Sequence, residues 1–194
     1  MDEPDTDSEG ALSVEVGSVA QTICRRSSWT DLIVLSLNHP PSPQPVARLR
    51  SGFRVLVRRC PVPVLAVPCD PSPLARPLLA YDGSPKAEEA LFVATYLAGS
   101  WHTPLLVLTV ADGGRVTSDT AARAREYLMV HGVQAECVEE SGPVPEAILR
   151  TAQAHQCDLL VMGGYGYGPL REAVLGSAVD RVLRESKVPV LLCR

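Results

Sequence analysis

The sequence has no long hydrophobic run and no excess of positive charge. It contains 18 lysine and arginine residues against 22 aspartate and glutamate residues, a formal net charge of −4, which excludes a strongly electrostatic hold on nucleic acid or an anionic membrane. Its longest apolar runs, such as 105–110 and 159–162, are far too short to span a bilayer. The first residues are acidic and lack the basic-then-apolar pattern of a signal peptide. We therefore expect a cytoplasmic protein that binds neither nucleic acid nor membrane.

Several nucleotide-binding and catalytic motifs are also missing. The chain has neither the G-x-x-x-x-G-K-[ST] pattern of a P-loop nor a G-x-G-x-x-G pattern, and it lacks the G-x-S-x-G pattern of a hydrolase. Its six cysteines include no C-x-x-C pair, and its four histidines are scattered. We interpret the cysteines as small buried hydrophobic residues, and predict neither a redox pair nor a metal site made by cysteine or histidine.

Short apolar segments alternate with helical patterns from residue 77 onward. Ser84 and Pro85 are a favourable N-cap and first residue for one of the helices. The expected strands lie at 78–81, 104–110, 133–138, 158–162 and 188–193. The expected helices begin at about residues 85, 118, 145 and 177. This alternation predicts an α/β fold with an open five-stranded parallel sheet and helices on both faces.

A glycine-rich stretch follows the fourth expected strand. Gly163 and Gly166 are separated by two residues, and nine more lead to Gly176 and Ser177, where a helix is expected to begin. The free N–H groups and the dipole of a helix start attract phosphate, and glycine lets a ligand approach the main chain closely. Ser177 adds a hydroxyl donor at the same place. The stretch therefore predicts a phosphate-binding loop.

This spacing, G-x2-G-x9-G-[S/T], resembles the nucleotide-binding motif of the ATP-binding branch of the universal stress protein family. Tyr81-Asp82-Gly83-Ser84 is similar to the end of that family's first strand, and Val188-Pro189-Val190-Leu191 is similar to its closing strand. The resemblance covers residues 77–194. It implies an adenine nucleotide α-hydrolase-like fold that binds ATP, ADP or AMP, with or without Mg²⁺, and a regulatory role in a stress response.

The resemblance also implies roles for single residues at the carboxyl ends of the first, second and fourth strands, where open α/β sheets bind ligands. Asp82 would face the ribose or a phosphate-bound metal ion, and Val110 would contact the adenine through its main chain. The residues expected around the ribose and phosphates are Met162, Gly163, Gly166, Gly176 and Ser177. Ser84 and Arg171 are further candidates for polar contacts.

Each of these assignments has an alternative. Asp82 and Gly83 can form a turn closed by an Asx hydrogen bond, and residues 163–168 can be a flexible connector. The sequence places no histidine or acidic residue as a base aimed at the phosphates, so we assign no catalytic residue and predict binding without efficient turnover. Slow ATP hydrolysis, assisted by a metal ion on Asp82, stays open.

The first seventy residues resemble the back half of a second domain of the same kind. Asp31-Leu32-Ile33-Val34 can be laid on Asp158-Leu159-Leu160-Val161, and Val62-Pro63-Val64-Leu65 repeats Val188-Pro189-Val190-Leu191, with about 126 residues between the copies. We therefore divide the chain into an acidic disordered tail (1–10), a degenerate partial universal stress protein domain (11–70), a linker (71–76) and a complete domain (77–194).

The partial copy is expected to be inactive as a site. Residues 38–45 are rich in proline where the glycine loop should lie, and proline offers no N–H donor. Dimers of the family commonly pair their last strands antiparallel. We therefore predict that 62–67 pairs antiparallel with 188–193 within one chain, and that the edge left free near 31–37 supports a homodimer. The alternative is an irregular N-terminal arm.

Two classes of function remain open from the sequence. The first is an adenine-nucleotide-binding regulator with one site per chain, which is at most a weak ATPase. The second is a scaffold or interaction protein of the same fold that binds no nucleotide and acts through dimerisation.

Replacing Gly176 with glutamate tests the predicted phosphate-binding loop. The added side chain and its negative charge at a helix start should repel phosphate, so we expect no measurable ATP binding in isothermal titration calorimetry. The circular dichroism spectrum should stay that of the unaltered protein. An unchanged affinity would refute the assigned site.

Overall fold

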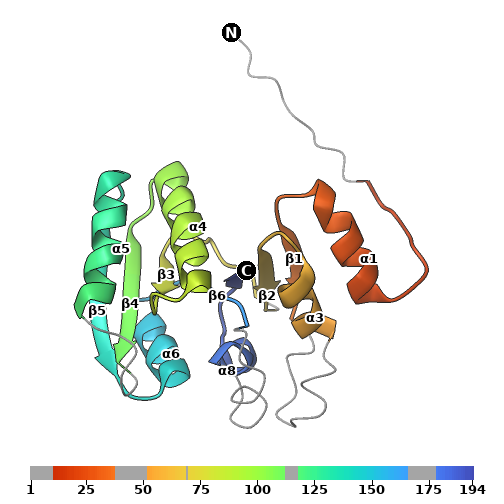
Figure 1. Cartoon of the computed structure of the whole chain (residues 1–194). Coiled ribbons are helices and arrows are strands. Elements are labelled where there is room, and N and C mark those ends of the chain that lie inside the picture. Colours follow the sequence, from red (N-terminus) through yellow and green to blue (C-terminus); the bar gives the residue numbers. More distant parts are fainter. Residues whose placement is uncertain (1–10, 38–51, 69, 112–117, 166–177) are drawn as a thin grey trace.

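The computed structural model describes residues 11–37, 52–68, 70–111, 118–165 and 178–194 (Figure 1). The predictions for the acidic tail, for the proline-rich segment and for the loop residues Gly166, Arg171, Gly176 and Ser177 lie outside these residues. No helix in the described ranges combines the length and the apolar character that crossing a bilayer requires.

One mixed sheet runs through the described part of the chain. Its strand order is β1-β2-β7-β6-β3-β4-β5, and every neighbouring pair is parallel except β2 and β7. The strands are β1 (Ile33–Ser36), β2 (Val64–Val67), β3 (Pro77–Ala80), β4 (Leu105–Ala111), β5 (Ala135–Ser141), β6 (Leu159–Gly163) and β7 (Val190–Cys193). The five strands from β3 to β7 form the predicted parallel sheet, because a helix connects each of them to the next.

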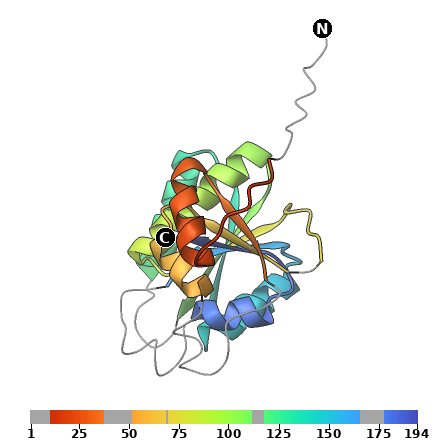
Figure 2. The same cartoon turned by 90° about the vertical axis from the view of Figure 1, so that its right-hand side faces the viewer.

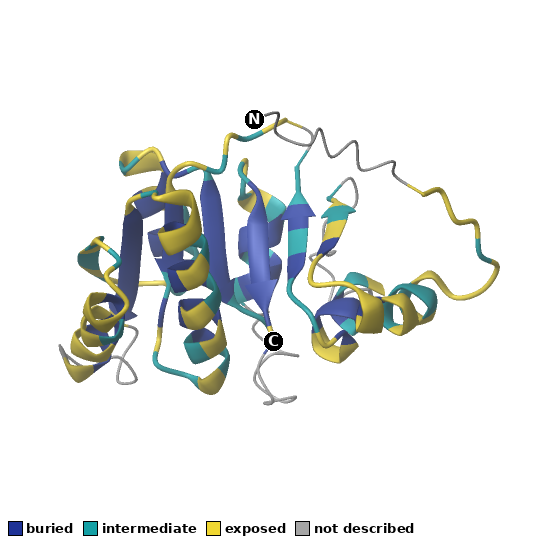
Figure 3. Ribbon diagram, turned by 90° about the horizontal axis from the view of Figure 1, so that it is seen from above, coloured by how far each residue is buried: buried dark blue, intermediate teal, exposed yellow. Residues whose placement is uncertain are grey.

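Helices cover both faces of this sheet (Figure 2). They are α1 (Val19–Arg26), the short 3₁₀ helix η1 (Ser27–Trp29), α3 (Gly52–Arg59), α4 (Pro85–Trp101), α5 (Ser118–Val130), α6 (Val144–Ala154) and α8 (Ala178–Glu185). One apolar cluster joins α4 and α5 to the sheet, and a second joins α3, α6 and α8 to the strand positions that point the other way. The inner strands are buried, whereas β1 at the edge is partly exposed (Figure 3).

Helix α4 begins where the sequence predicts. The Ser84 Oγ accepts a hydrogen bond from the Ala87 N–H at 3.3 Å, and Pro85 is the first helical residue. A serine N-cap followed by proline satisfies an otherwise unpaired N–H and presets the helical φ. The start of α4 is thereby fixed beside the carboxyl end of β3.

The N-terminal elements match the last elements of the chain in order and spacing. Elements β1, α3 and β2 begin 126 residues before β6, α8 and β7, as the bounds above show. When Ile33 is laid on Leu160, the residue after the first of β6, strand β1 also pairs with β2 in the register in which β6 pairs with β7, since Ile33 lies opposite Val64 and Leu160 lies opposite Val190. The pairing therefore agrees with the sequence superposition that places Ile33 on Leu160.

The predicted antiparallel pairing of the two last strands is confirmed. Leu65 of β2 lies opposite Leu191 of β7, flanked by the pairs Val64–Leu192 and Ala66–Val190. Because Leu65 and Leu191 occupy matching positions of the two strands, a local two-fold axis passes between them. The pairing covers an edge of β7 that would otherwise expose unpaired main-chain groups.

Two of the cysteines differ from the sequence-based interpretation. Cys24 of α1 and Cys60, directly after α3, form a disulfide with their Cα atoms 4.8 Å apart. The prediction of no redox pair was wrong for these two. The sequence does not reveal the pair, because 36 residues separate the two cysteines and only the packing of α1 on α3 brings them together. Cys157 and Cys193 are buried free thiols, as predicted, and burial raises the pKa of Cys193 to about 12.

The connection between β2 and β3 is anchored to Asp158. The main-chain N–H groups of Ala75 and Arg76 donate to its two carboxylate oxygens at 2.9 and 2.6 Å, and the Ser72 hydroxyl donates to its carbonyl at 2.6 Å. Asp158 directly precedes β6. The connection is therefore held against the middle of the sheet.

Candidate functional site

A cavity of about 700 Å³ lies at the carboxyl ends of β3, β4 and β6. Strands β3 and β6 are neighbours, and the chain leaves them in opposite directions, from β3 towards β4 and from β6 towards β7. Open α/β sheets bind ligands at such a reversal of strand order. The volume also falls within the range of small-molecule sites, roughly 300–1,000 Å³.

The turn between β3 and α4 forms one wall of this cavity. The Ser84 N–H donates to Asp82 Oδ1 at 3.0 Å, so the Asx turn is present. Gly83 has a φ of 71°, in the left-handed region that favours glycine. Asp82 is exposed and lines the cavity, as does Ser84. The Asp82 and Ser84 side chains therefore stabilise this turn and the start of α4 by their hydrogen bonds, and they also face the cavity.

Lys86 brings a positive charge to the same wall, and it is not among the site residues predicted from the sequence. It lies in the first turn of α4, is half-buried and lines the cavity. The start of this 17-residue helix already carries a partial positive charge. Lys86 lies far along the chain from the glycine-rich stretch, so a search for lysine near that stretch misses it. A lysine two residues after a helix N-cap was the available signal.

The end of β4 presents main-chain groups to the cavity. The Tyr81 N–H donates to the Leu108 carbonyl at 2.9 Å, so the main-chain groups of Leu108 point towards β3. Because alternate residues of a strand direct these groups to the same side, the N–H and carbonyl of Val110 also point that way. There β3 has already turned away at Asp82, and Val110 lines the cavity.

Gly163 and Gly164 are required by the packing of the protein itself. A Cβ atom on Gly163 would lie 2.9 Å from the Lys86 carbonyl carbon and 3.0 Å from the Ala87 nitrogen, both in α4. A Cβ on Gly164 would lie 2.9 Å from Val57 Cγ1 of α3. The sequence predicts glycine at position 163 because a ligand approaches the main chain closely. The structure gives a second reason, which is that α4 approaches Gly163 closely.

A polar cluster supports the Asp82 turn from the side of α5. The Tyr81 hydroxyl donates to Glu88 Oε1 at 2.5 Å, and Arg123 Nη2 lies 3.2 Å from the same oxygen and donates to the Gly83 carbonyl at 3.4 Å. Burial, together with Glu88, raises the pKa of Tyr81 to about 12. Tyr81 therefore remains protonated at neutral pH and cannot act there as a base.

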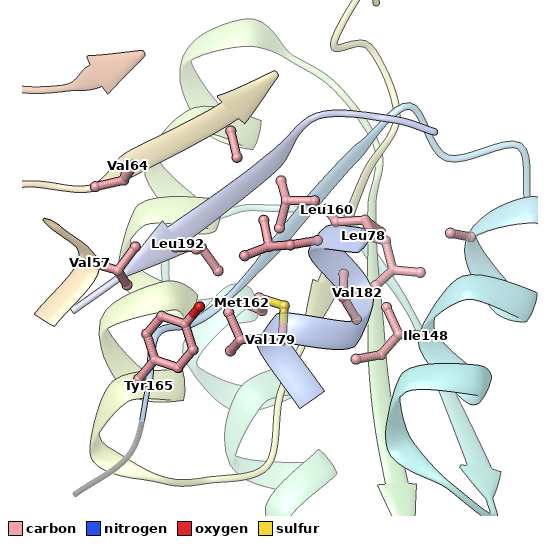
Figure 4. Close-up of a cluster of buried hydrophobic side chains, with 14 of the residues drawn as sticks. Val57, Val64, Leu78, Ile148, Leu160, Met162, Tyr165, Val179, Val182 and Leu192 are labelled. Atoms are coloured by element: carbon pink, nitrogen blue, oxygen red, sulfur yellow. The ribbon is translucent and has the colours of Figure 1, made fainter. Parts of the chain in front are cut away.

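Apolar side chains form the remaining described walls. Val144 and Ile148 come from α6, and Val179 comes from the first turn of α8. Met162 is buried at the end of β6 and lies beside Val179 (Figure 4). A site with apolar walls and a few polar groups suits an amphipathic small molecule.

The structure brings five of the predicted residues around this one cavity. They are Asp82, Ser84, Val110, Met162 and Gly163. Gly166, Gly176 and Ser177 lie outside the described residues, as does Arg171. Within the described ranges, no group of three or more histidine, cysteine, aspartate or glutamate residues could hold a metal ion.

Comparison with known proteins identifies relatives over most of the chain. Residues 76–194 match the model of the universal stress protein family. The universal stress protein Slr1230 of Synechocystis sp. is 30% identical over 169 residues, which cover 84% of this chain and 58% of that protein.

Solved structures show the same fold. The crystal structure of a universal stress protein from Archaeoglobus fulgidus DSM 4304 aligns with a TM-score of 0.75 and 25% identity, covering 90% of this chain and 64% of that one. A universal stress protein crystallised in complex with cAMP aligns with a TM-score of 0.52 and 21% identity, covering 62% of this chain and 97% of that one. The chain spans less than two thirds of Slr1230 and of the Archaeoglobus fulgidus protein.

Replacing Gly163 with alanine tests the packing of β6 against α4. The new Cβ would meet main-chain atoms that cannot rotate away, so we expect a loss of about 1–3 kcal/mol in the free energy of unfolding, measured with urea. Gly99→Ala is the matched control, because Gly99 lies inside α4 and its Cβ would make only an ordinary contact of 3.7 Å with Val133. That variant should gain about 0.5–1 kcal/mol. Equal stability of the two variants would contradict the described packing.

Proposed function

This chain belongs to the universal stress protein family, and on that premise we propose that it is an adenine-nucleotide-binding regulatory protein of a stress response. Residues 77–194 form the complete, nucleotide-binding domain with one site per chain. Residues 11–70 form a partial second domain that holds no nucleotide, joined to the first by the linker 71–76. The preferred ligand class is ATP, ADP or AMP.

The observation that carries this proposal is that two different kinds of group line one cavity. The main-chain N–H and carbonyl of Val110 are directed to the side of β4 on which β3 lies, and Val110 lines the cavity. These groups suit the edge of an adenine ring, which offers both donors and acceptors. Lys86 and the start of α4 lie at the turn that follows β3 and suit phosphate. The complex of a related fold with cAMP, a molecule with adenine, ribose and phosphate, supports the same ligand class.

Asp82 is the residue that would face the ribose or a phosphate-bound Mg²⁺. Its carboxylate is exposed and lines the cavity, while its Oδ1 is held by the Ser84 N–H. A single carboxylate fits a metal ion that arrives on the nucleotide phosphates, because Mg²⁺ is usually bound by one or two carboxylates together with substrate phosphates. The metal ion would neutralise phosphate charge when bound.

Regulation by binding is favoured over rapid hydrolysis. The titratable side chains among the described lining residues are Tyr81, Asp82, Lys86 and Tyr165. Burial keeps Tyr81 protonated, the Tyr165 hydroxyl donates a hydrogen bond to Asp180, and lysine is a cation at neutral pH. Asp82 is therefore the one described candidate for positioning water, so at most a weak ATPase is expected.

A specific observation also supports a homodimer, on which the alternative function as a scaffold depends. Val34 of the edge strand β1 has 59% of its surface exposed, and residues 33–36 carry no charge. The opposite edge strand, β5, carries Glu136, Glu139 and Glu140, which discourage pairing. Two β1 strands related by a two-fold axis would form a closed pair.

Nucleotide binding is tested by replacing Lys86 with alanine and titrating ATP and AMP by calorimetry. Losing a charged hydrogen-bond donor should weaken ATP binding by about ten- to a hundredfold. Lys187→Ala removes an exposed lysine outside the cavity and should bind as the unaltered protein does. Mass spectrometry of the small molecules released on denaturation identifies any nucleotide that is carried along.

The result that would overturn the nucleotide proposal is specific. An unaltered protein that releases no nucleotide, and whose melting temperature does not rise in millimolar ATP or AMP, has no such site. That result would leave the scaffold function as the better explanation of the fold.

The homodimer is tested by sedimentation equilibrium of Val34→Lys. A charge at this edge should shift the protein to monomer. Val130→Lys introduces the same charge on α5, where Val130 has 74% of its surface exposed, and should leave the dimer intact. A monomeric unaltered protein at high concentration would refute the pairing of β1 edges.

A further inference from the structure

Arg54 of α3 reaches from the N-terminal segment into the C-terminal part of the protein. Only 4% of its surface is exposed, which is rare for arginine unless its charge is paired. Its Nη1 lies 3.5 Å from Asp180 Oδ2, and its guanidinium carbon lies 4.6 Å from the centre of the Tyr165 ring. Arg54 therefore makes a buried ion pair and a cation–π contact, both across the junction of the two segments.

Asp180 and Tyr165 are joined to each other as well. The Tyr165 hydroxyl donates to Asp180 Oδ1 at 2.6 Å, and each residue is only 1% exposed. The three side chains thus form one buried polar cluster, in which the charge of Arg54 balances that of Asp180. Removing the guanidinium would leave a buried carboxylate without this partner, which is strongly unfavourable.

This cluster stands directly behind the cavity. Tyr165 follows β6, and Asp180 lies in the first turn of α8 next to Val179; Tyr165 and Val179 both line the cavity. Figure 4 shows Tyr165 between Val179 and the side from which Val57 of α3 approaches. Helix α3 therefore supports this wall through Arg54 and, by its contact at Gly164, through Val57.

The position of Arg54 in the local two-fold arrangement gives a second, independent argument. Arg54 is the third residue of α3 and Asp180 is the third residue of α8, so the two occupy matching positions of matching helices. Two identical units paired in this way would bring like charges together at this point. The opposite charges suit only the pairing of the N-terminal segment with the C-terminal one.

We propose that Arg54 is a positioning residue for the nucleotide site: it fixes Asp180 and Tyr165, and through them the wall formed by the end of β6 and the start of α8. The proposal rests on the proposed function, because it assigns the N-terminal segment a part in the same site. The segment holds no nucleotide itself but completes the site of its neighbour within the chain.

The test compares Arg54→Met, which keeps much of the side-chain volume without the charge, with Arg58→Met on the exposed side of the same helix. Both are made in the full chain, and ATP affinity is measured at a temperature where circular dichroism shows each variant to be folded. Arg54→Met should bind ATP about tenfold more weakly or worse, because small displacements of positioning groups have large effects. Arg54→Lys, which keeps the charge, should recover part of the affinity, and Arg58→Met should bind normally.

A double variant separates positioning from stability. Arg54→Met combined with Asp180→Leu replaces the buried ion pair by apolar groups, an exchange that often leaves stability intact. It should melt near the temperature of the unaltered protein and still bind ATP weakly, because Tyr165 has lost the Asp180 carboxylate that it donates to. Normal affinity in this double variant would overturn the proposal.

Hydrogen–deuterium exchange of the ligand-free protein gives a readout that needs no nucleotide. Arg54→Met should accelerate exchange in peptides that contain 163–165 and 178–180, relative to Arg58→Met. Unchanged exchange and unchanged ATP affinity would refute the role of Arg54 while leaving nucleotide binding in place. Absence of ATP binding by the unaltered protein would instead refute the proposed function, and with it a role of Arg54 in a nucleotide site.

Discussion

The antiparallel contact of β2 with β7 is the interaction on which the rest of this structure depends. It extends the sheet from the C-terminal strands into the N-terminal segment and covers an edge that would otherwise be open. It also sets where α3 lies, since α3 directly precedes β2 along the chain. The buried contacts of Arg54 and Val57 with the wall of the cavity follow from this placement. The N-terminal segment is therefore part of the architecture around the site.

The close packing of β6 against α4 also shapes the cavity. The end of β6 and the first turn of α4 approach so closely that Gly163 has no room for a side chain. This contact places Lys86 beside the end of β6, while the early turn of β3 at Asp82 uncovers the main chain of Val110. The packing of the protein thus requires glycine at this position of the motif whether or not a ligand binds. The combination of groups around the cavity is the stronger argument.

Much of this arrangement could be predicted from the sequence, because it depends on local patterns. Short stretches of sequence reveal the apolar segments of strand length, Ser84 and Pro85 at the start of α4, and the Val-Pro-Val-Leu that begins at residue 62 and again at residue 188. Contacts between distant segments could not be predicted in this way. The Cys24–Cys60 disulfide and the Arg54–Asp180 pair join residues whose separation carries no motif, and Lys86 reaches the cavity only once α4 has packed on β6. Arg54 moreover lies in the partial copy, which its proline-rich segment predicts to be inactive.

The connection between β2 and β3 determines how readily the N-terminal segment pairs with the C-terminal domain. It is short, and Asp158 holds Ala75 and Arg76 in place, so β2 stays close to β7 as long as the chain is intact. The pairing is therefore intramolecular, and its occupancy is governed by an effective concentration set by the tether. Dilution of the protein does not lower this effective concentration, whereas it does weaken the association of separate chains. The same sheet junction is thus present in a cell that makes few copies and in one that makes many.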